Sequence, residues 1–344
     1  MNRKSALVDG IYTLANDVVC NQLVALLNSI EVHAGREMPV AVIAYDNRLE
    51  QVKAAIAHRS QVTLLDDPAL FEPWEAFSRQ VWQAHPTAIA TWRKRDIPDI
   101  YRLSCNHRYA AFDDRAPFDR FLYLDADTLL LASPQIFFDA LDNHELVTYD
   151  FQHKDPSHIF NLNTPKLSQI FSNAEIVRSI FCSGCYASRR GLLNTEQRDW
   201  LLQNLTAGEA EILYPNAPNQ SVLNYMAMRL AQRENESFSI YNLALNLPRE
   251  QVTGNSVTSS HFVEQNGQVC DRGIPLTYLH YIGLSADLFN QLCNSINVDF
   301  PYRETFLHYR YLHEANQRPQ LSGKPVLPTP SLMQRLLRKL RLVA

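Results

Sequence analysis

Asp125 and Asp127 are the residues best suited to carry chemistry in this sequence. They stand one residue apart in the run FLYLDADTLLL, with apolar stretches on both sides. In a loop at the end of a strand, both carboxylates can reach one hard cation, and Mg²⁺ or Mn²⁺ typically binds one or two carboxylates together with substrate phosphates and water. A pair of solvated turn aspartates is the alternative, but charges this close to apolar runs are costly to bury. The pattern predicts a divalent-metal site and a phosphate-bearing substrate.

Alternating apolar segments predict an α/β fold that positions these carboxylates. The expected strands span 6–14, 38–44, 62–65 and 118–124, and the expected helices span 21–31, the first part of 47–66, and 100–112. Parallel strands need crossover helices between them, and open parallel sheets bind ligands beyond the carboxyl ends of their strands. Residues 67–97 are rich in Trp, Phe and Pro and give no assignment.

Charge is unevenly distributed along the chain. The 344 residues are 46% hydrophobic, which fits a globular protein with one large α/β domain or two small ones. The net charge is -4, but residues 331–344 hold four basic residues and no acid, which leaves the rest of the chain at -8. An acidic body argues against nucleic acid as a partner, because that binding relies on cations that neutralise phosphates.

No targeting segment is expected in this sequence. Asp9 and Asp17 interrupt what would be the apolar core of an export signal, and no stretch of about 18 apolar residues predicts a spanning helix. We therefore expect a cytoplasmic chain whose six scattered cysteines stay reduced. Cys182 and Cys185 form a C-x-x-C, for which a zinc or redox site is one interpretation and small buried side chains are the other.

The segment Asp125-Ala126-Asp127, in the setting YLDAD, matches the D-x-D motif of a known family. Together with other motifs in the same order, it makes residues 8–290 resemble the retaining glycosyltransferases typified by glycogenin and bacterial lipopolysaccharide galactosyltransferases. The resemblance implies the GT-A fold, a Rossmann-like α/β fold with a mixed central sheet flanked by helices. It also implies that His280, in the motif H-Y-x-G, completes the shell of a Mn²⁺ or Mg²⁺ ion with Asp125 and Asp127.

Further matches imply which residues meet the donor. The matching segments are TLAND at 13–17 (the loop for base and ribose), YRL at 101–103, FCSG at 181–184, NQSVLN at 219–224 and HYIG at 280–283. The donor-binding residues so implied are Thr13, Leu14, Ala15, Asn16, Asp17, Arg102, Ala126, Ser183, Gly184 and Gly283. The resemblance also implies that Asn219 and Gln220 orient the reacting sugar.

Several positions leave other interpretations open. Arg102 can instead pair with Asp96 or Asp99, His280 can be a hydrogen-bonded core residue, and Gln220 can be a polar residue that begins a helix. Three departures from the family pattern concern the donor: Leu-Ser-Ala replaces Lys-Pro-Trp after Gly283, Cys182 replaces a sugar-binding asparagine, and Asn219 replaces an aspartate. The identity of the donor hexose therefore cannot be carried over.

The resemblance implies a hexosyltransferase that takes sugar from a nucleotide-sugar, a UDP-sugar, and retains its configuration. The acceptor, whether sugar, lipid or protein, is not implied. A haloacid-dehalogenase phosphatase would need Thr or Val at the fifth position of its motif, where Leu129 stands, and a nucleotidyltransferase would need a glycine-rich loop after the first strand. A non-catalytic nucleotide-sugar-binding protein of the same fold remains the alternative, because fold does not imply activity.

The C-terminal region differs from the rest of the chain. We expect a transferase domain at 1–318, a Pro-rich linker at 319–330 and a basic amphipathic helix at 331–344. A helix of that composition fits an anionic membrane surface, which would place the protein at the inner face of the membrane. The alternative is a terminal helix docked on the acidic body.

Overall fold

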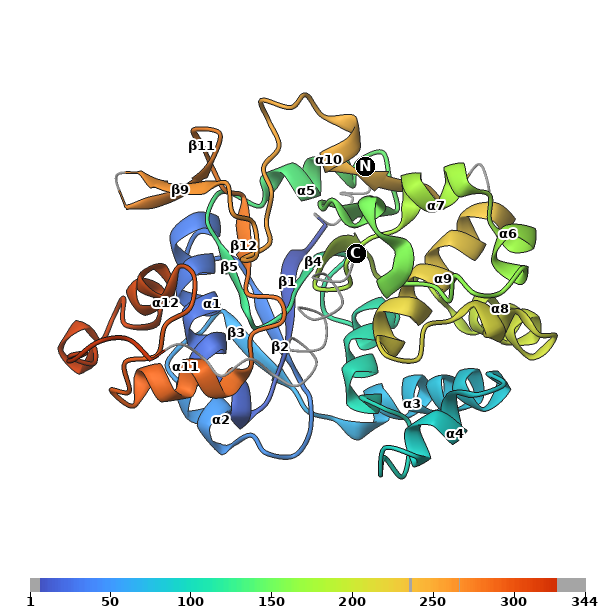
Figure 1. Ribbon diagram of the computed structural model, residues 1–344, viewed down its shortest axis with the longest axis horizontal. Coiled ribbons are helices and arrows are strands. Elements are labelled where there is room, and N and C mark those ends of the chain that lie inside the picture. The colour runs from blue at the N-terminus through green and yellow to red at the C-terminus, as the bar shows by residue number, and fades with distance from the viewer. Residues whose placement is uncertain (1–6, 235–236, 266, 327–344) are drawn as a thin grey trace, which may run out of the picture.

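The computed structural model describes residues 7–234, 237–265 and 267–326, and its centre is a mixed sheet in the order β3-β2-β1-β4-β7-β6-β8 (Figure 1). Strands β1 to β4 pair in parallel, whereas β7 is antiparallel to both of its neighbours. The strands of this sheet are β1 (Asp9–Ala15), β2 (Val40–Ala44), β3 (Val62–Leu65), β4 (Arg120–Leu124), β6 (Leu146–Thr148), β7 (Cys185–Arg189) and β8 (Ile240–Asn242).

Two smaller sheets lie beside the central one. Strand β5 pairs with the late strand β12, and a three-stranded sheet has the order β11-β10-β9. Their bounds are β5 (Thr128–Leu130), β9 (Phe262–Gln265), β10 (Gln268–Asp271), β11 (Ile274–Pro275) and β12 (Tyr278–His280). The β5–β12 pair matters most for the site, because it joins the chain directly after the aspartates to a segment about 150 residues later.

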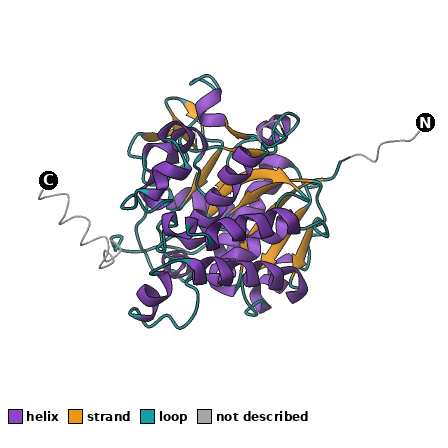
Figure 2. Ribbon diagram, turned by 90° about the vertical axis from the view of Figure 1, so that its right-hand side faces the viewer, coloured by secondary structure: helices purple, strands orange, loops and turns teal. Residues whose placement is uncertain are grey.

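Helices cover the sheet on both sides. Helix α1 packs against α11 and α12 on the left of Figure 1, and α3 packs against η2 and α8 on the right. Viewed from that right-hand side, helices lie in front of the fanned strands (Figure 2). The α-helices are α1 (Cys20–Ala34), α2 (Glu50–Ile56), α3 (Pro68–Ala84), α4 (Ala88–Arg93), α5 (Gln135–Ala140), α6 (Lys166–Ile170), α7 (Asn173–Ser179), α8 (Thr195–Thr206), α9 (Pro218–Arg233), α10 (Leu243–Asn246), α11 (Ala286–Cys293) and α12 (Arg303–Arg310). The 3₁₀ helices are η1 (Asp17–Val19), η2 (Leu103–Phe112), η3 (Gln152–Lys154), η4 (Pro156–His158), η5 (Glu209–Ile212) and η6 (Ala315–Gln317).

Buried apolar side chains form two clusters. The larger one fills the space around the central sheet, and strand β4 contributes Phe121, Leu122, Tyr123 and Leu124, all fully buried. The smaller one lies among β5, β12, α11 and α12 and includes Phe289 and Phe306. Both strands that flank the aspartates are therefore anchored in packed cores, which fixes the turn between them.

The expected α/β order is confirmed, and two regions differ from expectation. Residues 67–97, which had no assignment, form α3 and α4. Asp67 caps α3 by accepting a hydrogen bond from the backbone N–H of Ala69, and Pro68 occupies the first turn. The expected α-helix at 100–112 is a 3₁₀ helix that begins at Leu103.

The C-terminal expectations are only partly covered by the structure. Residues 319–326 are described and carry no helix, whereas the expected helix at 331–344 lies outside the described residues. Within the described part of the chain, no helix is long and apolar enough to span a bilayer.

Candidate metal and donor site

The turn Asp125-Ala126-Asp127 connects the buried end of β4 to β5. The backbone N–H of Asp125 donates to the Gly184 carbonyl (2.9 Å), and the N–H of Tyr281 donates to the Asp127 carbonyl (2.9 Å). The chain thus leaves the regular strand at the aspartates, and both carboxylates can face one point. Ala126 is buried in this turn, so a contact from it to a ligand would come from its backbone.

His280 reaches the aspartates because β12 pairs with β5. In that pairing His280 lies opposite Thr128, and its Nε2 lies 3.3 Å from Asp127 Oδ1. Ligand atoms of Asp125, Asp127 and His280 all lie within 4.8 Å of one another. Two carboxylates and an imidazole at this spacing fit a divalent cation of the Mg²⁺ or Mn²⁺ class.

Gly184 leaves room at this cluster that no side chain could share. A Cβ at this position would lie 2.4 Å from His280 Cε1 and 2.9 Å from Asp125 Oδ2. Both contacts are closer than packed atoms allow. The glycine thereby keeps a space open between the imidazole and the Asp125 carboxylate.

The charges at the cluster are strongly coupled. Burial alone would lower the pKa of His280, but the adjacent Asp127 carboxylate and the Cys182 thiol raise it well above its ordinary value. Burial would raise the pKa of Asp127, but His280 and its hydrogen bond lower it. Both shifts favour the charged forms of the pair, and a cation bound through the imidazole would compete with its proton.

Arg108 is the functional candidate that sequence reasoning missed. It lies on η2 with its side chain almost fully buried, and its Nη2 atom is 3.1 Å from Asp125 Oδ1. Its Nη1 donates to the Ser183 carbonyl (2.8 Å), and the Tyr123 hydroxyl donates to the same Asp125 oxygen (2.8 Å). Arg108 thus fixes one carboxylate oxygen and leaves the other, Oδ2, facing Gly184 and His280. An arginine placed 17 residues before Asp125, in the otherwise apolar run RYAAF, was the available signal.

Arg102 occupies a different position from that of Arg108. It is exposed, has a φ of 57° immediately before η2, and lies over the ring of Tyr101 at 5.3 Å. Its alternative partner Asp99 is paired with Arg79 instead. The structure therefore does not bring Arg102 to the carboxylates, and its proposed donor contact rests on the motif alone.

The N-terminus of α9 meets the turn before β7. Asn219 Nδ2 donates to Ser183 Oγ (3.2 Å), and Gln220 Oε1 accepts from the Ser183 backbone N–H (3.4 Å). Asn224 holds Phe181 through two hydrogen bonds of 2.8 Å, one to each backbone polar group. These contacts bring both residues expected to orient the sugar next to Gly184.

The expected base and ribose loop follows β1. Asn16 Oδ1 accepts from Val18 N–H, and its Nδ2 donates to Asp46 (2.9 Å), while the Asp17 carboxylate accepts backbone N–H groups at the start of α2. Both side chains are thus engaged in positioning this loop. Thr13, Leu14 and Ala15 are buried, so contacts from them to a ligand would come from the backbone.

Gly283 and the two cysteines of the C-x-x-C motif are the remaining positions that the sequence singled out. Gly283 is exposed, lies in the turn after β12 and has a φ of 82°, a conformation that favours glycine. Both cysteines of the C-x-x-C motif are free, and the metal-ligand group found among the described residues contains neither. Burial raises the pKa of the Cys185 thiol, as is typical of a cysteine packed in a core.

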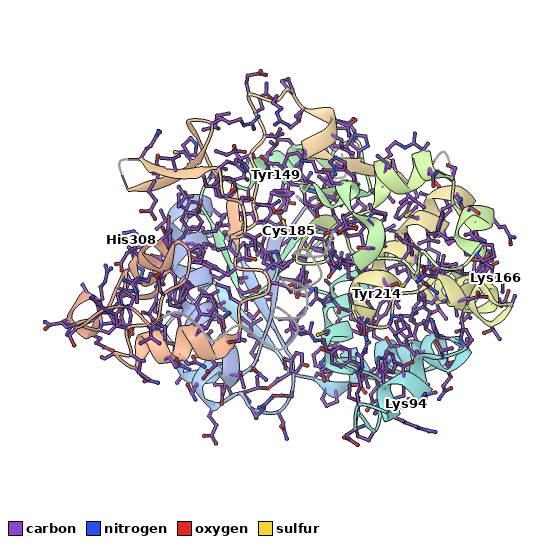
Figure 3. All side chains as sticks on the ribbon, viewed as in Figure 1. Lys94, Tyr149, Lys166, Cys185, Tyr214 and His308 are labelled. Atoms are coloured by element: carbon purple, nitrogen blue, oxygen red, sulfur yellow. The ribbon has the colours of Figure 1, made fainter. Side chains whose placement is uncertain are left out.

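A cavity of about 370 Å³ adjoins the cluster on the side of His280. It lies between the segment after β6 and the loops before and after the β9–β11 sheet. Tyr149, which directly precedes the lining residue Asp150, is labelled near the middle of the molecule in Figure 3. Asp150 lines its buried end and accepts the backbone N–H groups of Cys182 (2.5 Å) and Gln152 (2.8 Å). Burial raises the pKa of Asp150 to about 6, although these hydrogen bonds act against the shift.

The comparisons with known proteins bear on the fold. No family model and no curated protein matches the chain. Among solved structures, the bifunctional glycosyltransferase WbbM in its apo form has a TM-score of 0.50 and 14% identity over 93% of this chain and 53% of its own. This chain thus spans about half the length of WbbM.

Two further solved structures are similar at lower TM-scores. The galactosyltransferase LgtC, in complex with donor and acceptor sugar analogues, has a TM-score of 0.49 and 16% identity over 86% of this chain and 99% of its own. Mouse xyloside xylosyltransferase 1 in its apo form has a TM-score of 0.43 and 14% identity over 69% of this chain and 86% of its own. At such identities a likeness speaks only to the fold. With its mixed central sheet and its likeness to WbbM, the chain has the GT-A fold and resembles the glycosyltransferases built on it.

Proposed function

We propose that this chain is a metal-dependent glycosyltransferase that moves a sugar from a nucleotide-sugar, a UDP-sugar, to a sugar acceptor. The observation that carries the proposal is the convergence of Asp125, Asp127 and His280 within 4.8 Å, beside a glycine whose Cβ would fill the space. These three residues would hold Mn²⁺ or Mg²⁺. The ion, when bound, would neutralise charge on the departing diphosphate.

The residues around the cluster orient the donor. Arg108 fixes Asp125, and the α9 N-terminus holds Asn219 and Gln220 against the Ser183-Gly184 turn. The amide groups of Asn219 and Gln220 would hydrogen-bond sugar hydroxyls, which neutral amides do without a charge penalty. Arg102 and the loop at 13–17 are proposed to contact the nucleotide.

The acceptor enters the 370 Å³ cavity beside His280, where Asp150 can accept a hydrogen bond from an acceptor hydroxyl. In the transfer, the bond between the sugar C1 and the diphosphate oxygen breaks, and a bond forms between C1 and the acceptor oxygen. The acceptor proton passes to the departing phosphate oxygen, so that nucleoside diphosphate and glycoside are the products. Retention of configuration is proposed from the resemblance alone.

A panel of nucleotide-sugars tests the proposal. Donor binding is measured as Mn²⁺-dependent thermal stabilisation, because a ligand that binds the folded state raises its apparent stability. Donor hydrolysis and transfer are then measured with the best binder. Turnover that requires Mn²⁺ or Mg²⁺ supports the transferase, and binding without turnover would support a non-catalytic nucleotide-sugar-binding protein, which the missing Lys-Pro-Trp segment after Gly283 favours.

Asp127→Asn sharpens this test because the change removes a charged ligand at constant volume. Most metal-dependent turnover should be lost while the unfolding transition persists. Asp199→Asn is a matched control, since Asp199 is an exposed carboxylate on α8 that belongs neither to the metal cluster nor to the lining of the cavity. Full turnover of the Asp127 variant, or of the wild type in excess chelator, would contradict the proposal.

A further inference from the structure

The cavity beside His280 carries two cations, Lys154 and Arg249, that have no carboxylate partner among the residues the structure describes. Its other basic side chains are paired: Arg272 Nε lies 3.0 Å from Asp271 Oδ1, and His261 Nε2 lies 3.5 Å from the same oxygen. For Lys154 and Arg249, by contrast, no ion pair or side-chain hydrogen bond is formed within the described parts of the chain. Lys154 Nζ instead lies 4.7 Å from the centre of the Phe151 ring.

The two cations come from separate segments. Lys154 ends η3, after β6, and Arg249 follows α10, yet both line the same cavity. Both are exposed, whereas Asp150 and His280, which also line it, are buried. In a chain whose residues 1–330 carry a net charge of -8, two cations on the wall of one cavity favour an anionic ligand there.

We infer that the acceptor is an acidic saccharide, a sugar that bears a phosphate or carboxylate group besides the accepting hydroxyl. The guanidinium of Arg249 can bind either anion through two parallel hydrogen bonds, and Lys154 adds a point charge. An anion held at the exposed end would direct a hydroxyl of the same molecule toward Asp150 and His280. This inference rests on the proposed transferase function and names the substrate class of the same site.

The donor diphosphate is the competing occupant of these cations. The cavity is lined neither by Asp125 or Asp127 nor by any residue of the loop at 13–17. Of the residues proposed to hold the metal and the donor, only His280 lines it. An acceptor anion is the better match for that position.

Binding of three probes to the full chain tests the inference, with and without UDP and Mn²⁺. The probes are glucose 6-phosphate, glucuronate and glucose, and Kd is measured by ligand-observed NMR at low ionic strength. Both acidic probes should bind at least about tenfold more tightly than glucose, and added salt should reduce the difference. Preference for only one of them would identify the anion as phosphate or as carboxylate.

The variant Lys154→Gln/Arg249→Gln should bring the acidic probes to within about twofold of glucose, because only the charge-assisted contacts are lost. Arg93→Gln/Lys94→Gln is the matched control, since these residues lie at α4, at the lower edge of Figure 3, and should leave the preference unchanged. Equal affinity for all three probes, no detectable binding of either acid, or an unchanged preference in the cavity variant would each overturn the inference.

Measured separately, UDP binding with Mn²⁺ distinguishes the two proposals. Loss of UDP affinity in the cavity variant would assign the cations to the donor and overturn the acidic acceptor. If the wild type does not bind any nucleotide-sugar, the transferase proposal fails, whereas the anion preference of the cavity remains measurable without a donor.

Discussion

The guanidinium of Arg108 and the carboxylate of Asp125 form a buried ion pair, with Arg108 Nη2 3.1 Å from Asp125 Oδ1. The arginine also donates to the Ser183 carbonyl and, within η2, to the Cys105 carbonyl, so it ties this 3₁₀ helix to both Asp125 and the turn before β7. The Asp125 carboxylate is thus oriented as a metal ligand by a buried side chain of another element, Arg108 on η2.

Arg108→Lys should weaken Mn²⁺ binding by about 10-fold or more, because an ammonium cannot reproduce the forked contacts. Arg108→Ala should in addition lower the free energy of unfolding by roughly 3–5 kcal/mol, since Asp125 would keep a partly buried charge without its partner. Calorimetric titration with Mn²⁺ and denaturant unfolding measure the two effects. Arg102→Lys, at an exposed position, serves as the control and should change neither quantity. Wild-type metal affinity in Arg108→Lys would show that Tyr123 alone suffices to orient Asp125.

The two arginines show what the sequence could predict and what it could not. The apolar run before Asp125 predicted β4 and the carboxylates at its end, because burial of β4 depends on local sequence. Arg102 was expected from the family motif, whereas Arg108 belongs to no motif and was missed. Arg108 meets Asp125 through a tertiary contact between η2 and the end of β4, which no local pattern identifies.

Which distant strands pair with one another could not be predicted from local sequence either. That His280 meets Asp127 depends on the antiparallel pairing of β5 with β12, and neither three-residue strand has a pattern that identifies its partner. The expectation that His280 joins the two aspartates came only from the resemblance of its motif H-Y-x-G to that of the family. Helix α3 was missed for a local reason instead. Pro73 within the helix and the many aromatic residues hid the signal of its capped N-terminus.

Gly184→Ala should weaken metal binding more than it lowers stability. The new Cβ would lie 2.4 Å from His280 Cε1, so that the imidazole has to leave its place beside Asp127. We expect a loss of at least about 10-fold in Mn²⁺ affinity. Gly283→Ala is the contrasting variant: nothing lies within 4 Å of its Cβ, but its φ of 82° should cost about 1–2 kcal/mol of stability without moving His280. If both variants lose metal affinity equally, the space at Gly184 is not specific to the cluster.

Metal affinity should rise with pH through the neutral range. The pKa of His280 is raised, so the metal-free protein holds a proton on this ring that the cation must expel. The ion pair with Asp127 stabilises the metal-free fold below the unfolded histidine pKa of about 6.5, and this contribution is lost as pH rises through the higher folded pKa. Titrations in buffers of different ionisation enthalpy should therefore report proton release on Mn²⁺ binding. In His280→Ala this release should vanish and affinity should fall by about 10- to 100-fold. A pH-independent wild-type affinity would exclude His280 as a ligand.

The basic segment 331–344 is proposed to hold the protein at an anionic membrane surface. Each cation near such a surface contributes about 1 kcal/mol, and the segment has four. Deletion of 331–344 should abolish sedimentation with anionic vesicles and spare donor hydrolysis, because the proposed site residues all precede residue 290. A variant in which only the four basic residues are changed to Gln tests whether the charges of the segment, rather than its apolar residues, account for vesicle binding. Equal vesicle binding by the full and shortened chains would contradict membrane attachment.

Asp150 should make the folded state less stable as the pH rises from about 4 to 6. Its folded pKa is raised to about 6 by burial, above the unfolded value of 3.8, so the folded state binds more protons across this interval and loses stability as they leave. The size of the shift corresponds to about 3 kcal/mol at neutral pH. Asp150→Asn cannot ionise, so the free energy of unfolding of the wild type minus that of the variant should fall by about this amount between pH 4 and pH 7.

Asp155→Asn is the matched control on the same loop. Hydrogen bonds from Ser157 lower the pKa of Asp155, so the stability that its carboxylate contributes is lost only below about pH 4. The difference in free energy of unfolding between this variant and the wild type should therefore stay flat above that pH. Chemical denaturation at a series of pH values without metal measures both differences, and a flat profile for Asp150→Asn would show that the two backbone N–H groups offset the burial of its charge.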